Sequence, residues 1–264
     1  MTDYTVDRGL GVRDRMDLLA AVFAPSTRAL LDAVGISSGA SCIDVGCGGG
    51  HVAIELGRRV GPAGHVVGID LDTDLLEVAR TEAAAQGLDH VSFRVAAVED
   101  LAESSFDLSC ARMLLMHLRD PSRVARSMVA AVRPGGIVAV EDVDFSGSFT
   151  YPSCPAYVRR VAWYQETVRR RGGDADLGPR LPALLSSVGL TDIRVRVVQP
   201  AFLDGPHKHL QELSMLKQKA AVVAAGVASA EAYEAAHAEL VAFTADPTTL
   251  VAAPRMIQAW GRRP

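Results

Sequence analysis

Short apolar stretches alternate with longer amphipathic ones from about residue 41 to residue 141 of this chain. Short apolar runs bounded by glycine, proline or aspartate predict buried strands, and apolar positions three and four apart predict helices. The expected strands are 42–45, 65–70, 91–96, 106–112 and 137–141, and the expected helices are 51–60, 73–86 and 121–132. Repeated strand–helix–strand units of this length are typical of a parallel sheet covered by helices on both faces. The pattern therefore predicts a doubly wound α/β fold.

Helical patterns flank this alternation on both sides. The segment 8–34 has helical spacing and is expected to break near Ala24-Pro25-Ser26. Further helices are expected over 153–171, 180–188 and 207–245, and closing strands over 192–199 and from 254 to 260. We therefore expect a single domain over 1–264. Its core is 40–145, and its lid combines the N-terminal helices of 1–35 with the segments 146–191 and 200–253.

The composition excludes several classes of protein. The formal net charge is −4, and basic residues form only short runs such as Arg169-Arg170-Arg171, so we expect no nucleic-acid partner. The most apolar stretch, 220–230, falls well short of the ~20 residues that span a bilayer, so we expect no membrane association. The first residues lack the apolar core of a signal peptide, and the four cysteines form no CxxC pair. We therefore expect a cytoplasmic protein with reduced thiols and no metal site.

The sharpest motif is a glycine cluster, Asp44-Val45-Gly46-Cys47-Gly48-Gly49-Gly50, between a predicted strand and a predicted helix. A glycine-rich turn of this kind lets the backbone approach a ligand closely. The dinucleotide fingerprint GxGxxG fails, because His51 stands where its third glycine belongs. The Asp44 carboxylate would repel a pyrophosphate but suits an ammonium or a sulfonium, or it orients the turn by accepting backbone N–H groups. An NAD-dependent oxidoreductase is therefore disfavoured.

The next predicted strand ends in Gly68-Ile69-Asp70-Leu71. Asp70 is expected at the carboxyl end of the neighbouring strand, where a carboxylate can accept hydrogen bonds from two vicinal ribose hydroxyls. Leu71 would then flank an adenine ring. The two motifs in this order predict a site for an adenosyl ligand.

With these motifs the chain resembles the class I S-adenosylmethionine (SAM)-dependent methyltransferases, most closely the ubiquinone/menaquinone-biosynthesis type and related bacterial small-molecule enzymes. The resemblance covers about residues 40–145 and lies in DVGCGGG at 44–50, VVGIDLD at 66–72, FDLSCARMLLMHL at 106–118 and RPGGIVAVED at 133–142. It implies a Rossmann-like, mostly parallel seven-stranded sheet. It also implies SAM as cofactor, S-adenosylhomocysteine as product, and a SAM-binding core at 40–145.

The resemblance also assigns cofactor contacts. Gly46, Cys47 and Gly48 would surround the methionine part of SAM, and the Ala111 carbonyl would bind its amino group. Arg112 would meet the carboxylate. The family often has Asp where Ala97 stands. The adenine amino group would then be held by the backbone of Ala97 and Val98, or by Glu99.

The catalytic residues are less clearly marked, because a methyltransferase mainly aligns its acceptor and excludes water. Asp144, at the end of the fifth strand, and His117, after the fourth, are the candidates for removing a proton from the acceptor. His117 could equally cap or pack a helix.

We expect methyl transfer to an O, N or C atom of a small molecule by a monomer or homodimer. The excess of arginine over lysine hints at a GC-rich bacterial genome and hence at secondary metabolism. The alternatives are a SAM-binding enzyme with a non-methylating, cyclase-like reaction, and a protein or nucleic-acid methyltransferase.

Overall fold

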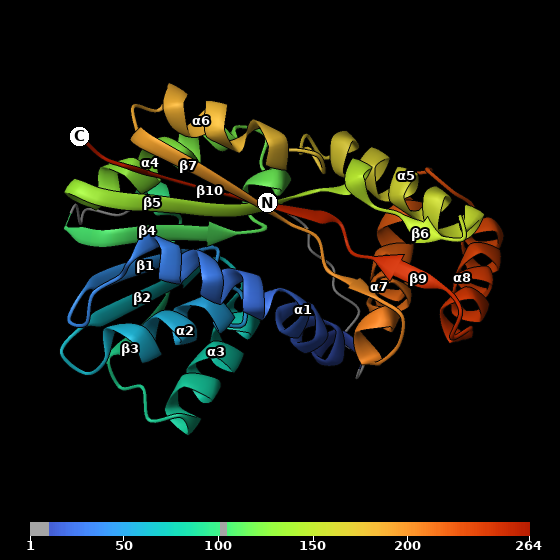
Figure 1. Ribbon diagram of the computed structural model, residues 1–264, viewed down its shortest axis with the longest axis horizontal. Coiled ribbons are helices and arrows are strands. Elements are labelled where there is room, and N and C mark those ends of the chain that lie inside the picture. Colours follow the sequence, from blue (N-terminus) through green and yellow to red (C-terminus); the bar gives the residue numbers. More distant parts are fainter. Residues whose placement is uncertain (1–10, 101–104) are drawn as a thin grey trace. The chain divides into compact units, whose positions relative to one another are not determined.

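The computed structural model describes residues 11–100 and 105–264. Within these ranges seven strands form one sheet in the order β3-β2-β1-β4-β5-β10-β7 (Figure 1). Its strands are β1 Ser41–Val45, β2 His65–Asp70, β3 Val91–Val95, β4 Phe106–Arg112, β5 Val132–Asp144, β7 Thr191–Val198 and β10 Arg255–Arg262. Strands β1 to β5 pair in parallel, and β10 pairs antiparallel with β7. The predicted doubly wound, mostly parallel seven-stranded sheet is confirmed.

The strand order explains where the helices lie. The chain moves outward from β1 through β2 to β3, and then in the opposite direction from β4 to β5. Because parallel crossovers are right-handed, this reversal puts helices on both faces of the sheet. Helices α2 (His51–Val60) and α3 (Thr73–Ala85) pack on β1 to β3, whereas α4 (Pro121–Ala131) packs on β4. The carboxyl ends of β1 and β4 meet at the reversal, which is the point where this fold class binds ligands.

Side-chain caps set the starts of two of these helices. The Asp72 carboxylate accepts hydrogen bonds from the backbone N–H groups of Asp74 and Leu75, and the Asp120 carboxylate accepts one from Arg123. Pro121 follows Asp120 at the first helical position, where its missing N–H costs nothing. The α3 and α4 boundaries therefore follow from local sequence, close to the predicted limits of 73–86 and 121–132.

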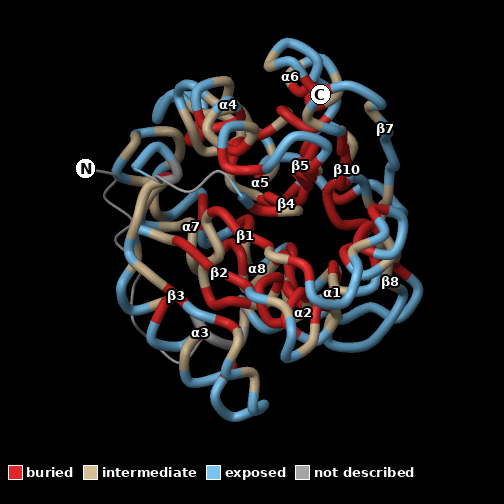
Figure 2. The backbone as a smooth tube through the Cα atoms, turned by 90° about the vertical axis from the view of Figure 1, so that its left-hand side faces the viewer, coloured by how far each residue is buried: buried red, intermediate tan, exposed pale blue. Residues whose placement is uncertain are grey.

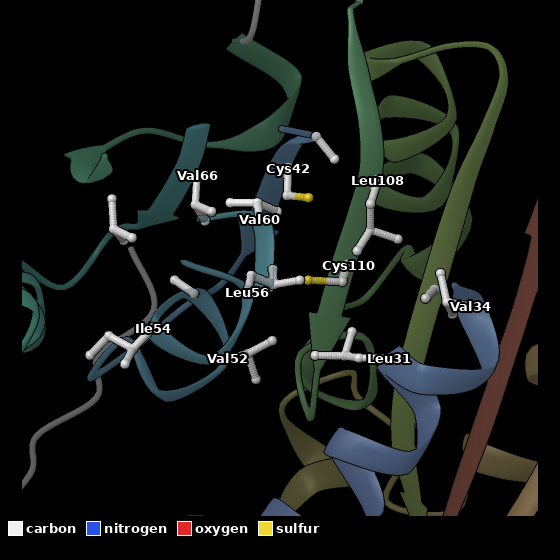
Figure 3. Packing of buried hydrophobic residues seen from close by; sticks show 14 of the residues in the cluster. Leu31, Val34, Cys42, Val52, Ile54, Leu56, Val60, Val66, Leu108 and Cys110 are labelled. Atoms are coloured by element: carbon white, nitrogen blue, oxygen red, sulfur yellow. The ribbon is translucent and has the colours of Figure 1, made fainter. Parts of the chain in front are cut away.

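The main core lies between α2 and the sheet. Side chains of α2 (Val52, Leu56 and Val60) are directed toward Cys42 on β1 and toward Leu108 and Cys110 on β4 (Figure 3). Leu31 and Val34, near the end of the first helix, join the same cluster. Burial raises the pKa of the Cys42 thiol to about 12, so this cysteine behaves as an apolar packing residue.

The first helix, α1 (Gly11–Val34), differs from the prediction. We expected a break near Pro25, but the helix continues through this residue. Proline removes one backbone hydrogen bond, to the carbonyl of Ala21, and crowds that carbonyl. Phe23 before it and Thr27 and Leu30 after it are all buried. We attribute the unbroken helix to this burial, which outweighs the local cost.

The chain divides into two compact units. The core unit consists of Ser26–Val143, Leu177–Val198 and Met256–Pro264, and it includes the helix α6 (Leu181–Ser187). The helical unit consists of Met1–Pro25, of which residues 11–25 are described, together with Asp144–Asp176 and Gln199–Arg255. The lid function predicted for 1–35, 146–191 and 200–253 stays a prediction.

The helical unit has its own core. Helices α5 (Pro155–Arg170), α7 (Leu210–Ala224) and α8 (Ala230–Ala245) pack on one another, so the predicted helical stretch 207–245 is two helices. A three-stranded sheet, β6 (Thr150–Tyr151), β9 (Leu250–Ala252) and β8 (Ala201–Phe202), completes the unit. These strands are too short to carry a period-two pattern, and sequence analysis missed them.

Exposure also varies within the main sheet. The central strands are buried, whereas the edge strand β7 is largely exposed (Figure 2). Val195 and Val197 lie on this edge strand, and more than half of each side chain is exposed. No helix within 11–100 or 105–264 is both long and apolar enough to cross a membrane.

Candidate functional site

The glycine turn joins the end of β1 to the start of α2. Gly46, Gly48 and Gly50 all have positive φ, at 68°, 50° and 81°, a region that favours glycine. A Cβ atom at Gly46 would lie 2.8 Å from Cδ1 of Leu114, so a side chain there would require Leu114 to move. At Gly48, by contrast, a Cβ atom would meet only Leu75, at 3.9 Å. The turn therefore presents backbone beside open space at Gly48, which is what close approach of a ligand requires.

Asp44 lies beneath this turn, at the end of β1. Only 1% of the residue is exposed, and its Oδ2 accepts a hydrogen bond from the N–H of Ala53, in the first turn of α2, at 3.0 Å. The Cys110 thiol lies 3.7 Å from Oδ1. Burial raises the pKa of Asp44 to about 7, although the positive charge of Arg112 and the Ala53 hydrogen bond oppose this rise. Asp44 thus ties β1 to α2, as in the alternative that we kept open.

Asp70 lies at the end of β2 and braces the same turn. Its Oδ2 accepts a hydrogen bond from the N–H of Gly48 at 2.8 Å, and its Oδ1 accepts one from Asp72 at 3.0 Å. The Cys47 N–H donates to the carbonyl of Ile69, so turn and strand are joined by the backbone as well. Each carboxylate oxygen has a second lone pair. Asp70 can therefore position the glycine turn and still accept hydrogen bonds from a ligand.

Leu71 follows Asp70 and is 65% exposed. A leucine side chain this open to water, directly after a buried strand, leaves a substantial apolar area uncovered. The next residue, Asp72, caps α3 and holds the backbone in place. Leu71 therefore offers a fixed apolar surface beside the Asp70 carboxylate.

The Cys47 side chain is half-buried, and its Sγ lies 3.9 Å from the Gly48 carbonyl oxygen. Burial is the main cause that raises the pKa of this thiol well above its ordinary value, and the charges of Asp44 and Asp70 add to the effect. A raised pKa favours the neutral thiol, so Cys47 is poorly suited to act as a nucleophile.

The end of β4 supplies the facing side of the reversal. Ala111 is buried, and Arg112 is half-buried and donates from Nη1 to the Thr27 hydroxyl at 3.2 Å. Arg112 also acts electrostatically on two buried carboxylates, those of Asp44 and Glu141. Burial raises the pKa of Glu141, whose Oε2 accepts a hydrogen bond from Gln258. Arg112 thus offsets negative charge at the end of the sheet.

The backbone geometry of Met113 was not predicted from the sequence. This residue has a φ of 53°, which is uncommon for a side chain of this size, and its N–H donates to the Glu141 carbonyl at 2.7 Å. Such conformations cluster at ligand sites, and this one lies where the strand order reverses. The sequence has no glycine or asparagine at 113 that could have signalled it.

A buried carboxylate also shapes the turn after Met113. Asp142 accepts a hydrogen bond from the Met116 N–H at 2.9 Å, within the short helix η2 (Leu115–His117). Burial raises the pKa of Asp142 to about 7. His117 is half-buried at the end of η2, and its N–H donates to the Leu114 carbonyl. Asp142 therefore holds the turn that carries His117.

Asp144 is placed differently from His117. It belongs to the helical unit, whereas His117 belongs to the core unit. The Asp144 side chain is almost fully buried and forms an ion pair with Arg255, with Oδ2 and Nη2 2.6 Å apart. Arg255 also passes close to the backbone of Gly147. Asp144 is thus already engaged in an ion pair with Arg255.

The predicted adenine-amino contacts lie after β3. Ala97 is half-buried, and Glu99 lies in the short helix η1 (Val98–Asp100), where its Oε1 is 3.4 Å from Nε of Arg123. The side chain of Val98 lies outside the described residues. The Ala96 N–H donates to the Asp70 carbonyl, so the segment begins beside the end of β2.

Together these residues fit SAM. Gly46 and Gly48 bend the backbone as a close cradle requires, Asp70 has free acceptor capacity, and Leu71 offers an apolar surface. A separate hollow, lined by residues such as Ser38, Asp107 and Arg133, lies at the opposite, amino-terminal edge of the sheet and does not belong to this site. No group of His, Cys, Asp and Glu suited to a metal ion occurs within 11–100 and 105–264.

Comparisons with known proteins agree with this geometry. Residues 36–169, about half of the chain, match the family described as "Methyltransferase domain". The demethylmenaquinone methyltransferase of Halalkalibacterium halodurans is 31% identical over 186 residues, 61% of this chain and 71% of that protein. The nocamycin O-methyltransferase of Saccharothrix syringae is 37% identical over 136 residues, 51% of this chain and 48% of that protein. The chain therefore spans about half the length of the nocamycin O-methyltransferase.

Solved structures show the same fold. A methyltransferase structure from Bacillus halodurans has a TM-score of 0.61 at 18% identity, covering 90% of this chain and 98% of that one. The [4+2]-cyclase SpnF has a TM-score of 0.54 at 18% identity, covering 90% and 81%. The family match spans the strands β1 to β5 with the glycine turn and Asp70, which are the parts that fit the cofactor. The chain therefore belongs to the methyltransferase domain family and is a SAM-dependent methyltransferase with a Rossmann-like fold.

Proposed function

We propose that this enzyme transfers the methyl group of SAM to an O, N or C atom of a small molecule, with oxygen as the first candidate, in secondary metabolism. The observation that carries the proposal is the pairing of an open glycine turn with Asp70 and Leu71 at the point where the strand order reverses. The relative from Saccharothrix syringae is named as an O-methyltransferase of nocamycin, which supports oxygen and a secondary metabolite.

In this proposal the core unit holds the cofactor. The backbone of Gly46, Cys47 and Gly48 surrounds the methionine part, and the Asp70 carboxylate accepts hydrogen bonds from the ribose hydroxyls. Leu71 covers the adenine ring, whose amino group meets the segment Ala97, Val98 and Glu99. SAM would supply a methyl group bonded to a positively charged sulfur. The acceptor atom would bond to the methyl carbon in line as the carbon–sulfur bond breaks, and neutral S-adenosylhomocysteine would leave. The half-exposure of Gly48 and the free lone pairs of Asp70 support these roles.

The polar end of the cofactor meets β4. The Ala111 carbonyl accepts from the amino group, and Arg112 pairs with the carboxylate. The hydrogen bond from Arg112 to Thr27 engages Nη1, so the other nitrogens of the guanidinium serve this contact. The Asp44 carboxylate contributes its charge from below the turn, where it favours a cationic ligand.

The acceptor needs a proton acceptor only if it is a hydroxyl or an ammonium group. His117 or Asp144 fills this role in the proposal, and the ion pair of Asp144 with Arg255 makes His117 the first choice. Turnover that is unchanged in both His117→Ala and Asp144→Asn would refute this part. The variants should be compared at equal SAM saturation, so that a loss of cofactor binding is not mistaken for a loss of chemistry.

The first experiment is a calorimetric titration of the wild type and Asp70→Ala with SAM, S-adenosylhomocysteine and NAD. We expect micromolar binding of both adenosyl ligands, a loss of at least about tenfold in Asp70→Ala, which equals about 1.4 kcal/mol, and no binding of NAD. Glu77→Ala, an exposed carboxylate on α3, is the control and should bind as the wild type does. Binding of NAD alone would refute the cofactor assignment.

Product analysis separates the reaction classes. The fold is shared with a protein named as a [4+2]-cyclase, so the fold by itself does not define the reaction. A product that gains one methyl group, with S-adenosylhomocysteine formed in equal amount, supports methyl transfer. A product of unchanged mass, formed without consumption of SAM, would support the cyclase-like alternative.

A further inference from the structure

Arg160 lies on the buried face of α5, inside the helical unit. Only 2% of the residue is exposed, and its helical neighbours Ala156 and Tyr157 are buried as well. A guanidinium is a large, permanently charged group that proteins rarely bury without a partner. Its surroundings should therefore contain an acceptor for each of its N–H groups.

The described residues provide no such acceptor for two of its nitrogens. Nε and Nη1 of Arg160 are buried and have no hydrogen-bond partner within 11–100 and 105–264. The nearby phenols are directed elsewhere: the Tyr157 hydroxyl donates to the Ala252 carbonyl at 2.5 Å, and the Tyr233 hydroxyl donates to the Met215 carbonyl at 2.8 Å.

The charged and polar groups near Arg160 do not balance its positive charge. Tyr157, Tyr164 and Tyr233 face it, together with a second guanidinium, that of Arg15, and the groups that act most strongly on it include no carboxylate. Burial lowers the pKa of Arg160, and the positive charge of Arg15 acts in the same direction. Arg15 itself donates from Nε to the Ser214 hydroxyl at 3.1 Å.

An aromatic ring does not replace the missing partner. The Phe145 ring centroid lies 5.9 Å from Cζ of Arg160, close to the outer limit of about 6 Å for a cation–π contact. Such a contact leaves N–H groups without acceptors, and buried N–H groups without acceptors are strongly unfavourable. Within the described residues, Nε and Nη1 of Arg160 therefore have no acceptor, neither an anion nor a carbonyl.

We propose that Arg160 binds an anionic group of the substrate, a carboxylate or a phosphate. A guanidinium in a dry, aromatic surrounding is well suited to such a group, because a charge-assisted hydrogen bond is strong where water is excluded. The substrate is then a small molecule that carries a carboxylate or a phosphate group. The inference rests on the proposed function in one respect, the identification of the ligand as the substrate. The anion site itself does not depend on it, because Arg160 belongs to the helical unit.

The test uses thermal unfolding of the whole chain with simple anions. The probes are sodium benzoate for a carboxylate and inorganic phosphate for a phosphate, with benzyl alcohol as the neutral control, all at constant ionic strength. Arg160→Met removes the charge and nearly keeps the volume. The matched control is Arg159→Gln, which changes the exposed neighbour that pairs with Glu239.

We expect one of the two anions to raise the Tm of the wild type and of Arg159→Gln by several degrees and to leave Arg160→Met unchanged. The anion that does so identifies the group that the site prefers. No shift of the wild type with either anion, or the same shift in Arg160→Met, would overturn the proposal.

A second readout separates binding from a structural role. Without added anion, Arg160→Met should have a Tm equal to or above that of the wild type, because it no longer buries an unpaired charge. A large fall in Tm would mean that the guanidinium holds the fold together, and the proposal would be wrong. Arg160→Lys keeps the charge and should show a reduced anion shift. If neither variant folds, the guanidinium is structural and the proposal also fails.

Cofactor binding keeps this test independent of the proposed function. SAM should bind Arg160→Met as it binds the wild type, since Arg160 and the glycine turn belong to different units. A chain that binds anions through Arg160 but not SAM would refute the proposed function and leave the anion site standing. A chain that binds SAM but shows no anion effect would refute the anion site and leave the proposed function standing.

Discussion

Asp44→Asn tests whether the carboxylate beneath the glycine turn costs stability when it is ionised. The side chain is 1% exposed, and its Oδ2 accepts the Ala53 N–H. The oxygen of an asparagine amide can accept the same hydrogen bond. The substitution therefore removes the charge and keeps the link between β1 and α2.

The direction in which stability changes with pH follows from the pKa of Asp44. Burial raises the pKa of Asp44 from 3.8 to about 7, so the folded chain holds this proton more tightly than the unfolded chain does. The contribution of Asp44 to the free energy of unfolding is then highest at low pH. It falls as the pH rises from about 4 to about 7 and is constant above that. The whole effect is about 4 kcal/mol, and between pH 5 and pH 8 it is about 3 kcal/mol. The Asp142 carboxylate, whose pKa is also raised to about 7, is present in both proteins and cancels in the comparison.

The measurement is urea unfolding of the wild type and Asp44→Asn at pH 5 and pH 8, followed by circular dichroism and tryptophan fluorescence. Relative to the wild type, Asp44→Asn should be more stable at pH 8 than at pH 5 by about 3 kcal/mol. Asp204→Asn changes an exposed carboxylate and should differ from the wild type by the same amount at both pH values. A constant difference for Asp44→Asn as well would refute the reasoning, and it would mean that Arg112 fully offsets the burial of this charge.

Two further predictions concern the cofactor site. In urea unfolding, Gly46→Ala should destabilise the chain by about 2 kcal/mol more than Gly87→Ala does. Both glycines have positive φ, but only Gly46 faces another side chain, that of Leu114. Equal destabilisation by the two substitutions would exclude the steric argument. Leu71→Ser should weaken calorimetric binding of S-adenosylhomocysteine about tenfold and change the unfolding free energy by less than about 0.5 kcal/mol. Leu203→Ser changes another exposed leucine, in the helical unit, and should leave binding unchanged. A similar loss in both variants would contradict a specific role for Leu71.

Much of the core unit could be predicted from its sequence, because the signals there are local. Short apolar runs define β1 to β4, and the caps Asp72 and Asp120 define the starts of α3 and α4. The glycine cluster at 46–50 and Asp70 could be assigned to one ligand because parallel strands bring their carboxyl ends to the same edge of a sheet. The cofactor was thus predictable from residues that are well separated in the chain.

Other features depend on packing between distant segments, which no local pattern records. The helix across Pro25, the positive φ of Met113 and the short strands β6, β8 and β9 are each stabilised by contacts from elsewhere in the chain. The sequence showed the acids Asp44, Asp142 and Asp144 but not their partners. The structure gives these acids different surroundings, since Asp44 and Asp142 accept backbone N–H groups whereas Asp144 pairs with Arg255.

Arg160 shows most clearly the difference between what the local sequence determines and what the tertiary structure determines. In the sequence it is one of two adjacent arginines in a helix, and nothing distinguishes it from Arg159. Only the fold buries Arg160 among aromatic rings and leaves Arg159 at the surface beside Glu239. Local sequence determined β1 to β4, the helices α2 to α4 and the glycine turn, because propensity and hydrophobic period act over a few residues. Burial, hydrogen-bond partners and charge balance are properties of the surroundings, and only the tertiary structure decided those.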